Sequence, residues 1–224
     1  MTRSIGLICL LSALSVYAGE IHSHVTITRG LTKKRVTLPA YQLRGAPIRS
    51  SPPASSTVDE LSLVAVYLEG KDLKAGQSLH LEMKQRNREF EPDIIIAPIG
   101  STISFPNADP IFHNVFSLSQ AKAFDLGYYP LGQSRTLRFD KAGIAQVYCH
   151  LHPNMSGAIV VVPSAWYGEP DADGNLVFSE VPAGACKIVA WHKSAGLLRR
   201  RISVPESGSV DIELAIPVLD KKRE

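Results

Sequence analysis

The chain has 224 residues, of which 45% are hydrophobic and 20% charged, a composition typical of globular proteins and unlike that of disordered or multi-span membrane chains. Its net charge of +3, from 24 Lys and Arg against 21 Asp and Glu, is too small and too evenly scattered to indicate a nucleic-acid partner. Three cysteines are too few for a disulfide framework.

The first 18 residues are typical of an export signal. Arg3 is the positive charge that precedes an apolar run at residues 5–16, and Val16-Tyr17-Ala18 places small residues where a signal peptidase cuts. The apolar run is about half as long as a membrane-spanning helix, which argues against a permanent membrane anchor. We therefore predict a signal peptide at residues 1–18 and a periplasmic location.

Cleavage leaves two cysteines, Cys149 and Cys186. Two cysteines in an oxidising compartment usually form one disulfide, unless one of them has another role. If cleavage falls one residue later, the new N-terminus is Glu20-Ile21-His22. Such a tripeptide can bind Cu(II) through its amine, two amide nitrogens and the imidazole, in the square-planar geometry that Cu(II) favours. The alternative is a frayed terminus in which His22 and His24 are merely solvated.

The rest of the chain predicts an all-β fold. One segment, residues 118–124, has a sequence compatible with a turn or two of helix, and residues 49–57 form a Pro-rich polar loop. Many short strands separated by turn residues favour β-sandwiches. The predicted strands lie at residues 25–28, 35–38, 61–68, 93–97, 101–105, 135–139, 146–149, 158–162, 176–178, 187–191 and 210–216.

A metal-ligating motif follows one of these strands. Cys149, His152 and Met155 have the spacing C-x2-H-x2-M, and His113 lies 36 residues before Cys149. Each residue alone would be assigned to the core or to a solvated loop. Together they supply one thiolate, two imidazoles and one thioether, the ligand set of a blue-copper electron-transfer site. Zinc is disfavoured because a thioether is not among its usual ligands. If Cys149 binds copper, it is not available to form a disulfide.

These motifs resemble the cupredoxins, specifically the amicyanin, pseudoazurin and plastocyanin group, over residues 90–162. The short Cys-x2-His-x2-Met loop is most similar to that of amicyanin. The resemblance implies a Greek-key β-sandwich with one type 1 copper ion at one end. By that resemblance His113, Cys149 and His152 are equatorial ligands and Met155 is the axial ligand. Asn114 would bind no metal but would tie the two ligand loops together.

The flanks of this region resemble another family. Residues 171–176 (DADGNL), 181–184 (VPAG) and 188–191 (IVAW) are similar to the second half of a carboxypeptidase-regulatory-like domain, a small transthyretin-like sandwich. Residues 25–68 are candidates for the missing first half. The copper domain would then be inserted into a second sandwich, although three successive units remain an alternative. The whole chain is similar to exported methylamine-utilisation-like proteins. The predicted parts after the signal are 19–81 and 163–216 for the flanking sandwich, 82–162 for the copper domain, and a charged tail at 217–224.

Two further residues, His150 and Cys186, lie close to these motifs in the sequence. Strand alternation predicts that His150 points away from the metal, although His150 remains an alternative ligand to His152. Cys186 has the same parity as Ile188 and Ala190 and is expected to face the core of the second sandwich.

The ligand set favours an exported carrier of single electrons. His152 is the expected exit for the electron, and Pro130, Leu131, Leu151 and Pro153 are candidates for an apolar contact surface around it. Redox partners that meet transiently need only a small interface.

Other functions remain possible on the sequence alone. The alternatives are a copper-binding or delivery protein, and a carbohydrate-binding-like module with accessory copper that contacts glycan through the flanking sandwich. An enzyme is disfavoured, because a multicopper oxidase needs about eight further histidines, and the whole chain has seven.

Overall fold

The computed structural model of the chain describes residues 18–28, 31 and 59–217. Strands are the main regular structure of the described residues, which confirms the all-β class, and η1 (Leu61–Leu63) is a single 3-10 turn. No helix within these ranges combines the length and hydropathy needed to cross a membrane. Residues 1–17 of the predicted signal, the strand predicted at 35–38, the loop at 49–57 and the tail from 218 lie outside the described residues.

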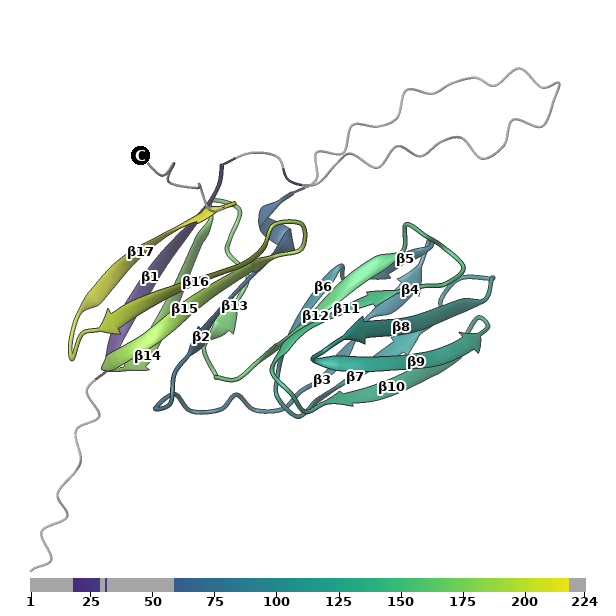
Figure 1. Cartoon of the computed structure of the whole chain (residues 1–224), viewed down its shortest axis with the longest axis horizontal. Helices are drawn as coiled ribbons and strands as arrows, with labels where there is room; N and C mark the ends of the chain where they lie inside the picture. The colour runs from purple at the N-terminus through teal and green to yellow at the C-terminus, as the bar shows by residue number, and fades with distance from the viewer. Residues whose placement is uncertain (1–17, 29–30, 32–58, 218–224) are drawn as a thin grey trace, which may run out of the picture.

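The first sandwich carries the copper motif. Its two main sheets have the strand orders β10-β7-β3 and β6-β12-β11-β8-β9, and a small ribbon of β4 and β5 lies beside them (Figure 1). Its core contains Met83, Phe105, Val115 and Ile159, packed between these sheets. The strands are β3 (His80–Glu82), β4 (Lys84–Arg86), β5 (Glu89–Glu91), β6 (Ile94–Pro98), β7 (Ser101–Pro106), β8 (His113–Ser119), β9 (Lys122–Tyr129), β10 (Ser134–Phe139), β11 (Gly143–Tyr148) and β12 (Ser156–Val162).

Residues 118–124 form a hairpin, so the helical turn expected there is wrong. β8 and β9 pair antiparallel through this segment, with Leu118 opposite Ala123. The extended backbone directs Phe124 toward the core, where its ring lies 6.2 Å from that of Phe105 and 6.2 Å from that of Phe139. Packing of this one aromatic side chain therefore outweighs the local helical tendency of the sequence.

The second sandwich is built from both ends of the described chain. Its sheets have the orders β14-β1-β17 and β13-β2-β15-β16 (Figure 1). β1 and β2 are interior strands, and every neighbour of either one comes from the C-terminal part of the chain. Neither end can complete a sheet without the other. The strands are β1 (Ala18–Ile27), β2 (Val64–Glu69), β13 (Tyr167–Gly168), β14 (Asn175–Pro182), β15 (Gly184–His192), β16 (Gly196–Val204) and β17 (Ser209–Ile216).

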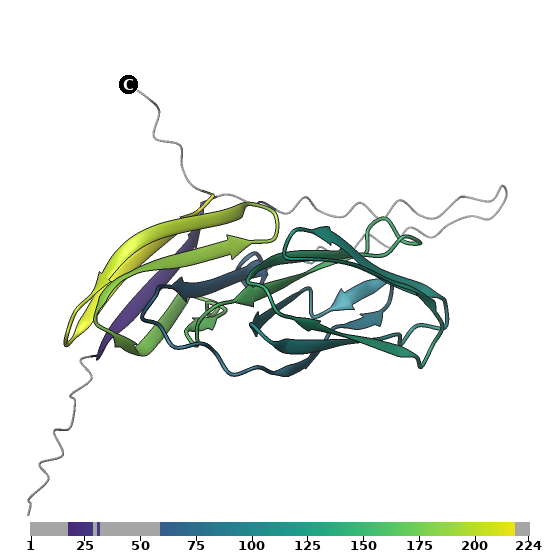
Figure 2. The same cartoon turned by 60° about the horizontal axis from the view of Figure 1, so that its bottom comes forward.

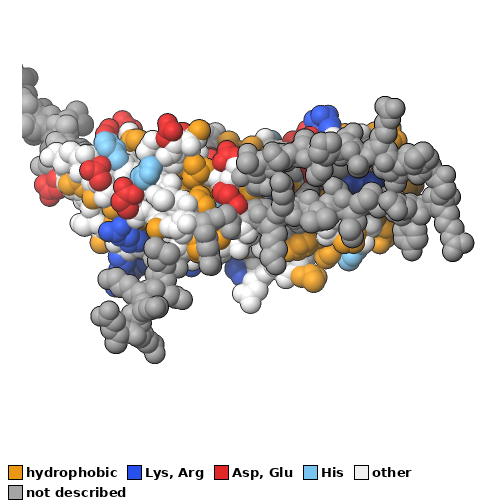
Figure 3. Space-filling view, turned by 90° about the horizontal axis from the view of Figure 1, so that it is seen from above, with side chains coloured by type: hydrophobic (Ala, Val, Ile, Leu, Met, Phe, Trp, Pro, Cys, Tyr) orange, Lys and Arg blue, Asp and Glu red, His pale blue; other side chains and the backbone are white. Residues whose placement is uncertain are grey.

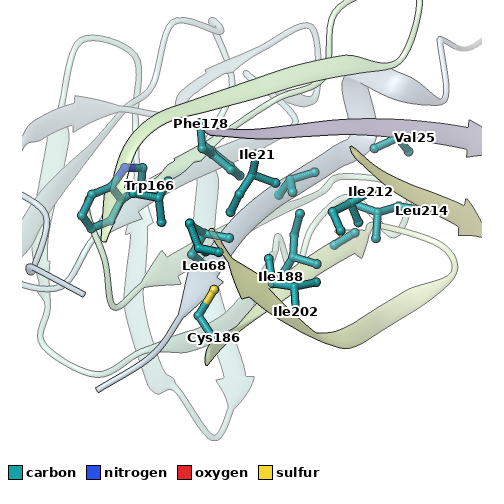
Figure 4. Packing of buried hydrophobic residues seen from close by; sticks show 14 of the residues in the cluster. Ile21, Val25, Leu68, Trp166, Phe178, Cys186, Ile188, Ile202, Ile212 and Leu214 are labelled. Atoms are coloured by element: carbon teal, nitrogen blue, oxygen red, sulfur yellow. The ribbon is translucent and has the colours of Figure 1, made fainter. Parts of the chain in front are cut away.

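The core of the second sandwich lies between its two sheets. Figure 4 shows Ile21 and Phe178 from one sheet facing Leu68 and Ile188 from the other. Cys186 belongs to the same buried cluster, as its parity predicted, and burial raises the pKa of its thiol. This cysteine is therefore an apolar core residue.

The structure corrects two expectations at element boundaries. The predicted start of the copper domain at residue 82 is too late, because β3 (His80–Glu82) pairs with β7 of the first sandwich. The N-terminal strand is also not frayed. Ile21 is fully buried, and β1 pairs with β14 on one side and with β17 on the other. The amide of Glu20 donates to the carbonyl of Gly208. A square-planar Cu(II) site on the backbone of residues 20–22 is incompatible with this pairing.

The two sandwiches share an apolar interface. β12 presents Ala158, Val160 and Val162 to a cluster that includes Tyr67 of β2 and Trp191 of β15. Figures 1 and 2 show the sheets that contain these strands side by side. The sheet that contains β2 and the sheet that contains β12 are therefore each covered on both faces. This explains why residues 64–68 (VAVYL) and 158–162 (AIVVV) are uninterrupted apolar runs instead of alternating ones.

Lys193 joins the two sandwiches at the edge of this interface. It lies in the turn between β15 and β16, and its side chain is 17% exposed. Its Nζ is 2.7 Å from Asp93 Oδ1 and 2.9 Å from the carbonyl oxygen of Ser156, both in the first sandwich. Ser156 directly follows Met155, so this contact ties the second sandwich to the end of the predicted ligand loop.

Lys193→Met is expected to lower the free energy of unfolding by about 1–2 kcal/mol, because the variant leaves the Ser156 carbonyl and the Asp93 carboxylate without their charged donor. The midpoint of urea unfolding measures this loss. Lys187→Met is the matched control, since Lys187 is an exposed lysine on β15. Equal midpoints for the two variants would contradict the assigned role of Lys193.

Candidate metal centre

Three loops meet at one end of the first sandwich. Residues 107–112 precede β8, residues 130–133 follow β9, and residues 149–155 connect β11 to β12. His113 is the first residue of β8 and pairs with Tyr129, the last residue of β9. Cys149 directly follows β11. The ends of three neighbouring strands thus hold the sequence-predicted ligands together.

His113, Cys149 and His152 form a compact donor group. Cys149 Sγ lies 3.8 Å from His113 Nδ1 and 3.6 Å from His152 Nδ1. The potential ligand atoms of the three residues all lie within 4.8 Å of one another. Sulfur and nitrogen bound at about 2.3 Å and 2.0–2.1 Å to one ion are about 3.6–3.8 Å apart for angles between tetrahedral and trigonal. The observed separations therefore fit one metal ion bound by all three side chains.

The ligand loop is closed by its own backbone. The amide of Met155 donates to the carbonyl of His152, and the amide of Cys149 donates to the carbonyl of Met155. Met155 is buried in the same core cluster as Cys149. The C-x2-H-x2-M spacing is thus the length of a tight turn that brings a buried methionine beside the donor group.

A buried carboxylate orients the first histidine. His113 is fully buried, and its Nε2 donates to Oδ2 of Asp109 at 2.8 Å. The proton on Nε2 leaves the lone pair on Nδ1, the nitrogen that faces Cys149. Burial acts to raise the pKa of Asp109, but hydrogen bonds from the Arg88 amide, His113 and the Asn87 amide outweigh it, so this pKa is lowered. Asp109 therefore remains a carboxylate at neutral pH.

Asp109 was not identified as a site residue from the sequence, because Asn107-Ala108-Asp109-Pro110 predicts a turn. The turn is present, since the Asp109 amide donates to the side chain of Asn107. A signal was nevertheless available, because the acidic residue stands four positions before a candidate ligand. The ligating histidines of metal sites usually donate their second nitrogen to a carboxylate or a carbonyl.

Asp109→Ala is expected to weaken copper binding about 10- to 100-fold, because His113 loses the acceptor that fixes its tautomer. Competition with a chelator of known affinity measures the change. Asp109→Asn is the matched control, since its amide oxygen can still accept from His113, and it should bind copper more tightly than the alanine variant. Unchanged affinity in Asp109→Ala would contradict the orienting role.

Asn114 and His150 lie beside the donor group and outside it. The Oδ1 of Asn114 accepts from the His150 amide at 3.4 Å, and its Nδ2 donates to Asp125 Oδ1 at 2.6 Å. Asn114 thereby connects β8 to the ligand loop. The imidazole of His150 stacks on Phe116 with ring centroids 3.7 Å apart and is about half exposed. The structure places the His152 ring, and not the His150 ring, next to Cys149.

His152 is the more exposed of the two histidines in the donor group. Partial burial lowers its pKa, with a further contribution from His113, and this favours the neutral imidazole that binds metal. Leu131 and Leu151, both named as contact candidates, are about half exposed, and so is Phe112, which was not. These side chains and Pro153, also exposed, belong to the three loops that surround the donor group.

No protein-family model and no curated protein sequence matches the chain. Solved structures are similar to part of the chain. A purple cupredoxin from Nitrosopumilus maritimus has 22% identity and a TM-score of 0.34, covering 37% of this chain and 99% of its own. A reduced amicyanin variant has 20% identity and a TM-score of 0.36, and the similarity covers 43% of this chain and 98% of the amicyanin chain. A copper-containing nitrite reductase from Thermus scotoductus SA-01 has 23% identity and a TM-score of 0.36, covering 42% of this chain but 24% of its own.

Proposed function

We propose that this protein is an exported carrier of single electrons with one type 1 copper ion. The observation that carries the proposal is the buried Cys149 Sγ, which lies 3.8 Å from His113 Nδ1 and 3.6 Å from His152 Nδ1. Bound copper supplies a one-electron couple between Cu(I) and Cu(II), and sulfur and imidazole ligands suit it. Met155 is the proposed axial ligand.

The surrounding chain is suited to hold this ligand set still. His113 is fixed by Asp109, Asn114 connects the two ligand segments, and the turn from Cys149 to Met155 is closed by two backbone hydrogen bonds. Ligands that keep their positions between oxidation states make electron transfer fast, because little structure has to reorganise.

The exposed side of the site suits a transient partner. His152 is partly exposed at the end of the sandwich, and Phe112, Leu131 and Leu151 supply exposed apolar surface on the neighbouring loops. Redox encounters use small interfaces, so a few such side chains suffice. We propose that electrons enter and leave through the His152 imidazole, passing to periplasmic redox proteins, and that the chain is not itself an enzyme.

A potentiometric titration of the copper-loaded protein tests this function. Stepwise reduction should remove the visible colour with one electron per chain, and reoxidation should restore it fully. Met155→Leu should keep the colour and raise the potential, because a weak axial donor that favours Cu(II) is lost. A protein that releases its copper on reduction would contradict the carrier and favour a delivery protein.

A further inference from the structure

A second group of metal-ligating side chains lies on the second sandwich. β1 is the central strand of its outer sheet, and alternation along it buries Ile21 and Ser23 while it directs His22 and His24 to the solvent face. Figure 3 shows histidine side chains among acidic side chains on this sandwich. Neither histidine has a place in the proposed copper centre.

The neighbouring strand supplies carboxylates at the same level. β17 runs parallel to β1, with Asp211 paired with His22 and Glu213 paired with His24. Both acidic residues are exposed. With Glu20 on β1, three carboxylates lie on the same face as the two imidazoles, so this face attracts cations.

The contacts of His22 have the geometry of a ligand with an orienting partner. Its Nε2 lies 3.1 Å from Glu20 Oε2, a hydrogen bond in which the ring donates. Its Nδ1 then carries the lone pair and lies 3.5 Å from Asp211 Oδ1. That separation is long for a hydrogen bond. It is close to the roughly 3.4 Å between a nitrogen and an oxygen bound to one tetrahedral ion.

His24 is oriented in the same manner. Its Nδ1 lies 3.0 Å from the side-chain oxygen of Asn175 on β14. Donation to that oxygen leaves the lone pair on Nε2, the tautomer that binds metal through Nε2. Residues two apart in a strand are about 6.6 Å apart along it. Rotation of the two rings can bring their nitrogens to the spacing of two ligands on one ion.

We propose that His22 Nδ1, His24 Nε2 and Asp211 form a second metal site, which takes a divalent transition ion such as Zn(II) or Cu(II). Imidazole and carboxylate ligands suit both ions. The site contains no sulfur, so it differs in chemistry from the Cys149 centre, and it does not rest on the proposed electron-transfer function.

Calorimetric titration with Zn(II) tests this site in the full-length mature protein with copper already loaded. One further equivalent of Zn(II) should bind. His22→Ala and His24→Ala should each weaken it at least about tenfold, and Asp211→Asn should weaken it too. His80→Ala is the matched control, since His80 is an exposed strand histidine of the first sandwich, and it should change nothing. Repeating the titration with Cu(II) shows which ion binds more tightly.

Three results would overturn the proposal. The first is that no further equivalent of Zn(II) binds. The second is that the double variant His22→Ala, His24→Ala binds Zn(II) as tightly as the unaltered protein. The third is that His22→Ala weakens Zn(II) binding while His24→Ala does not. The last would indicate an N-terminal site that uses the amine and His22 alone. A titration of Cys149→Ser gives the same readout without the first site, so failure of the copper centre and failure of the second site are distinguishable.

Discussion

Cys149→Ser is expected to abolish the visible absorption of the copper-loaded protein. The colour of a blue-copper site comes from charge transfer between the thiolate and copper, and an oxygen in place of Sγ cannot supply it. Serine is nearly the same size, and Cys149 is buried at the end of the core of its sandwich, so the expected cost in unfolding free energy is about 1–2 kcal/mol. Absorption spectra of the two loaded proteins at equal concentration measure the effect.

Cys186→Ser is the matched control for this experiment. Cys186 is the other cysteine of the described residues, and it lies in the core of the second sandwich. Its serine variant should keep the full colour and lose stability to a similar extent. Retained blue colour in Cys149→Ser, with copper bound, would show that this thiolate is not a ligand.

Deletion of residues 163–224 is expected to make the protein insoluble. The deletion removes both neighbours of β1 and two neighbours of β2, so Val64, Val66 and Leu68 lose the strands that bury them. The deletion also removes Trp191 and its neighbours from the apolar interface between the two sandwiches, which exposes Val160 and Val162 of β12. Unpaired apolar strands and large apolar faces promote aggregation. The soluble fraction after expression and the binding of a hydrophobic dye to any soluble material measure the result.

A soluble, well-folded remainder would contradict this expectation and favour successive independent units. The interface also matters for the predicted copper domain, residues 82–162, when it is expressed alone. This fragment lacks His80 and Leu81 of β3, and the apolar face of its β6 and β12 is uncovered, so we expect it to fold less stably than the same sandwich in the whole chain.

The ligand residues were the most predictable part of the site, because their chemistry is tied to a short spacing. Cys149, His152 and Met155 occupy one loop and were found from their spacing, whereas the strand that begins at His113 was not among the predicted strands. Asp109 was not identified, because its role depends on a contact between the loop before β8 and the His113 ring. A local turn explained the same residues equally well.

The strand content was predictable from composition, whereas the arrangement of strands required the structure. The apolar runs at 64–68 and 158–162 indicated buried strands, but a run that lacks alternation does not say what covers its second face. The structure supplies the answer in Tyr67 and Trp191, which face β12 across the interface. β3 was missed because three residues in a charged segment carry too little pattern to be recognised.

The decisive test of the type 1 copper centre is the absorption spectrum of the mature protein loaded with Cu(II), with the copper content measured on the same sample. We expect one equivalent of copper at the Cys149 centre to give an intense visible band from thiolate-to-copper charge transfer. The second site contains no sulfur, so copper bound there adds no thiolate band and this band reports the Cys149 centre alone. A copper-loaded protein with only the weak absorption of nitrogen- and oxygen-bound Cu(II) would contradict the type 1 centre.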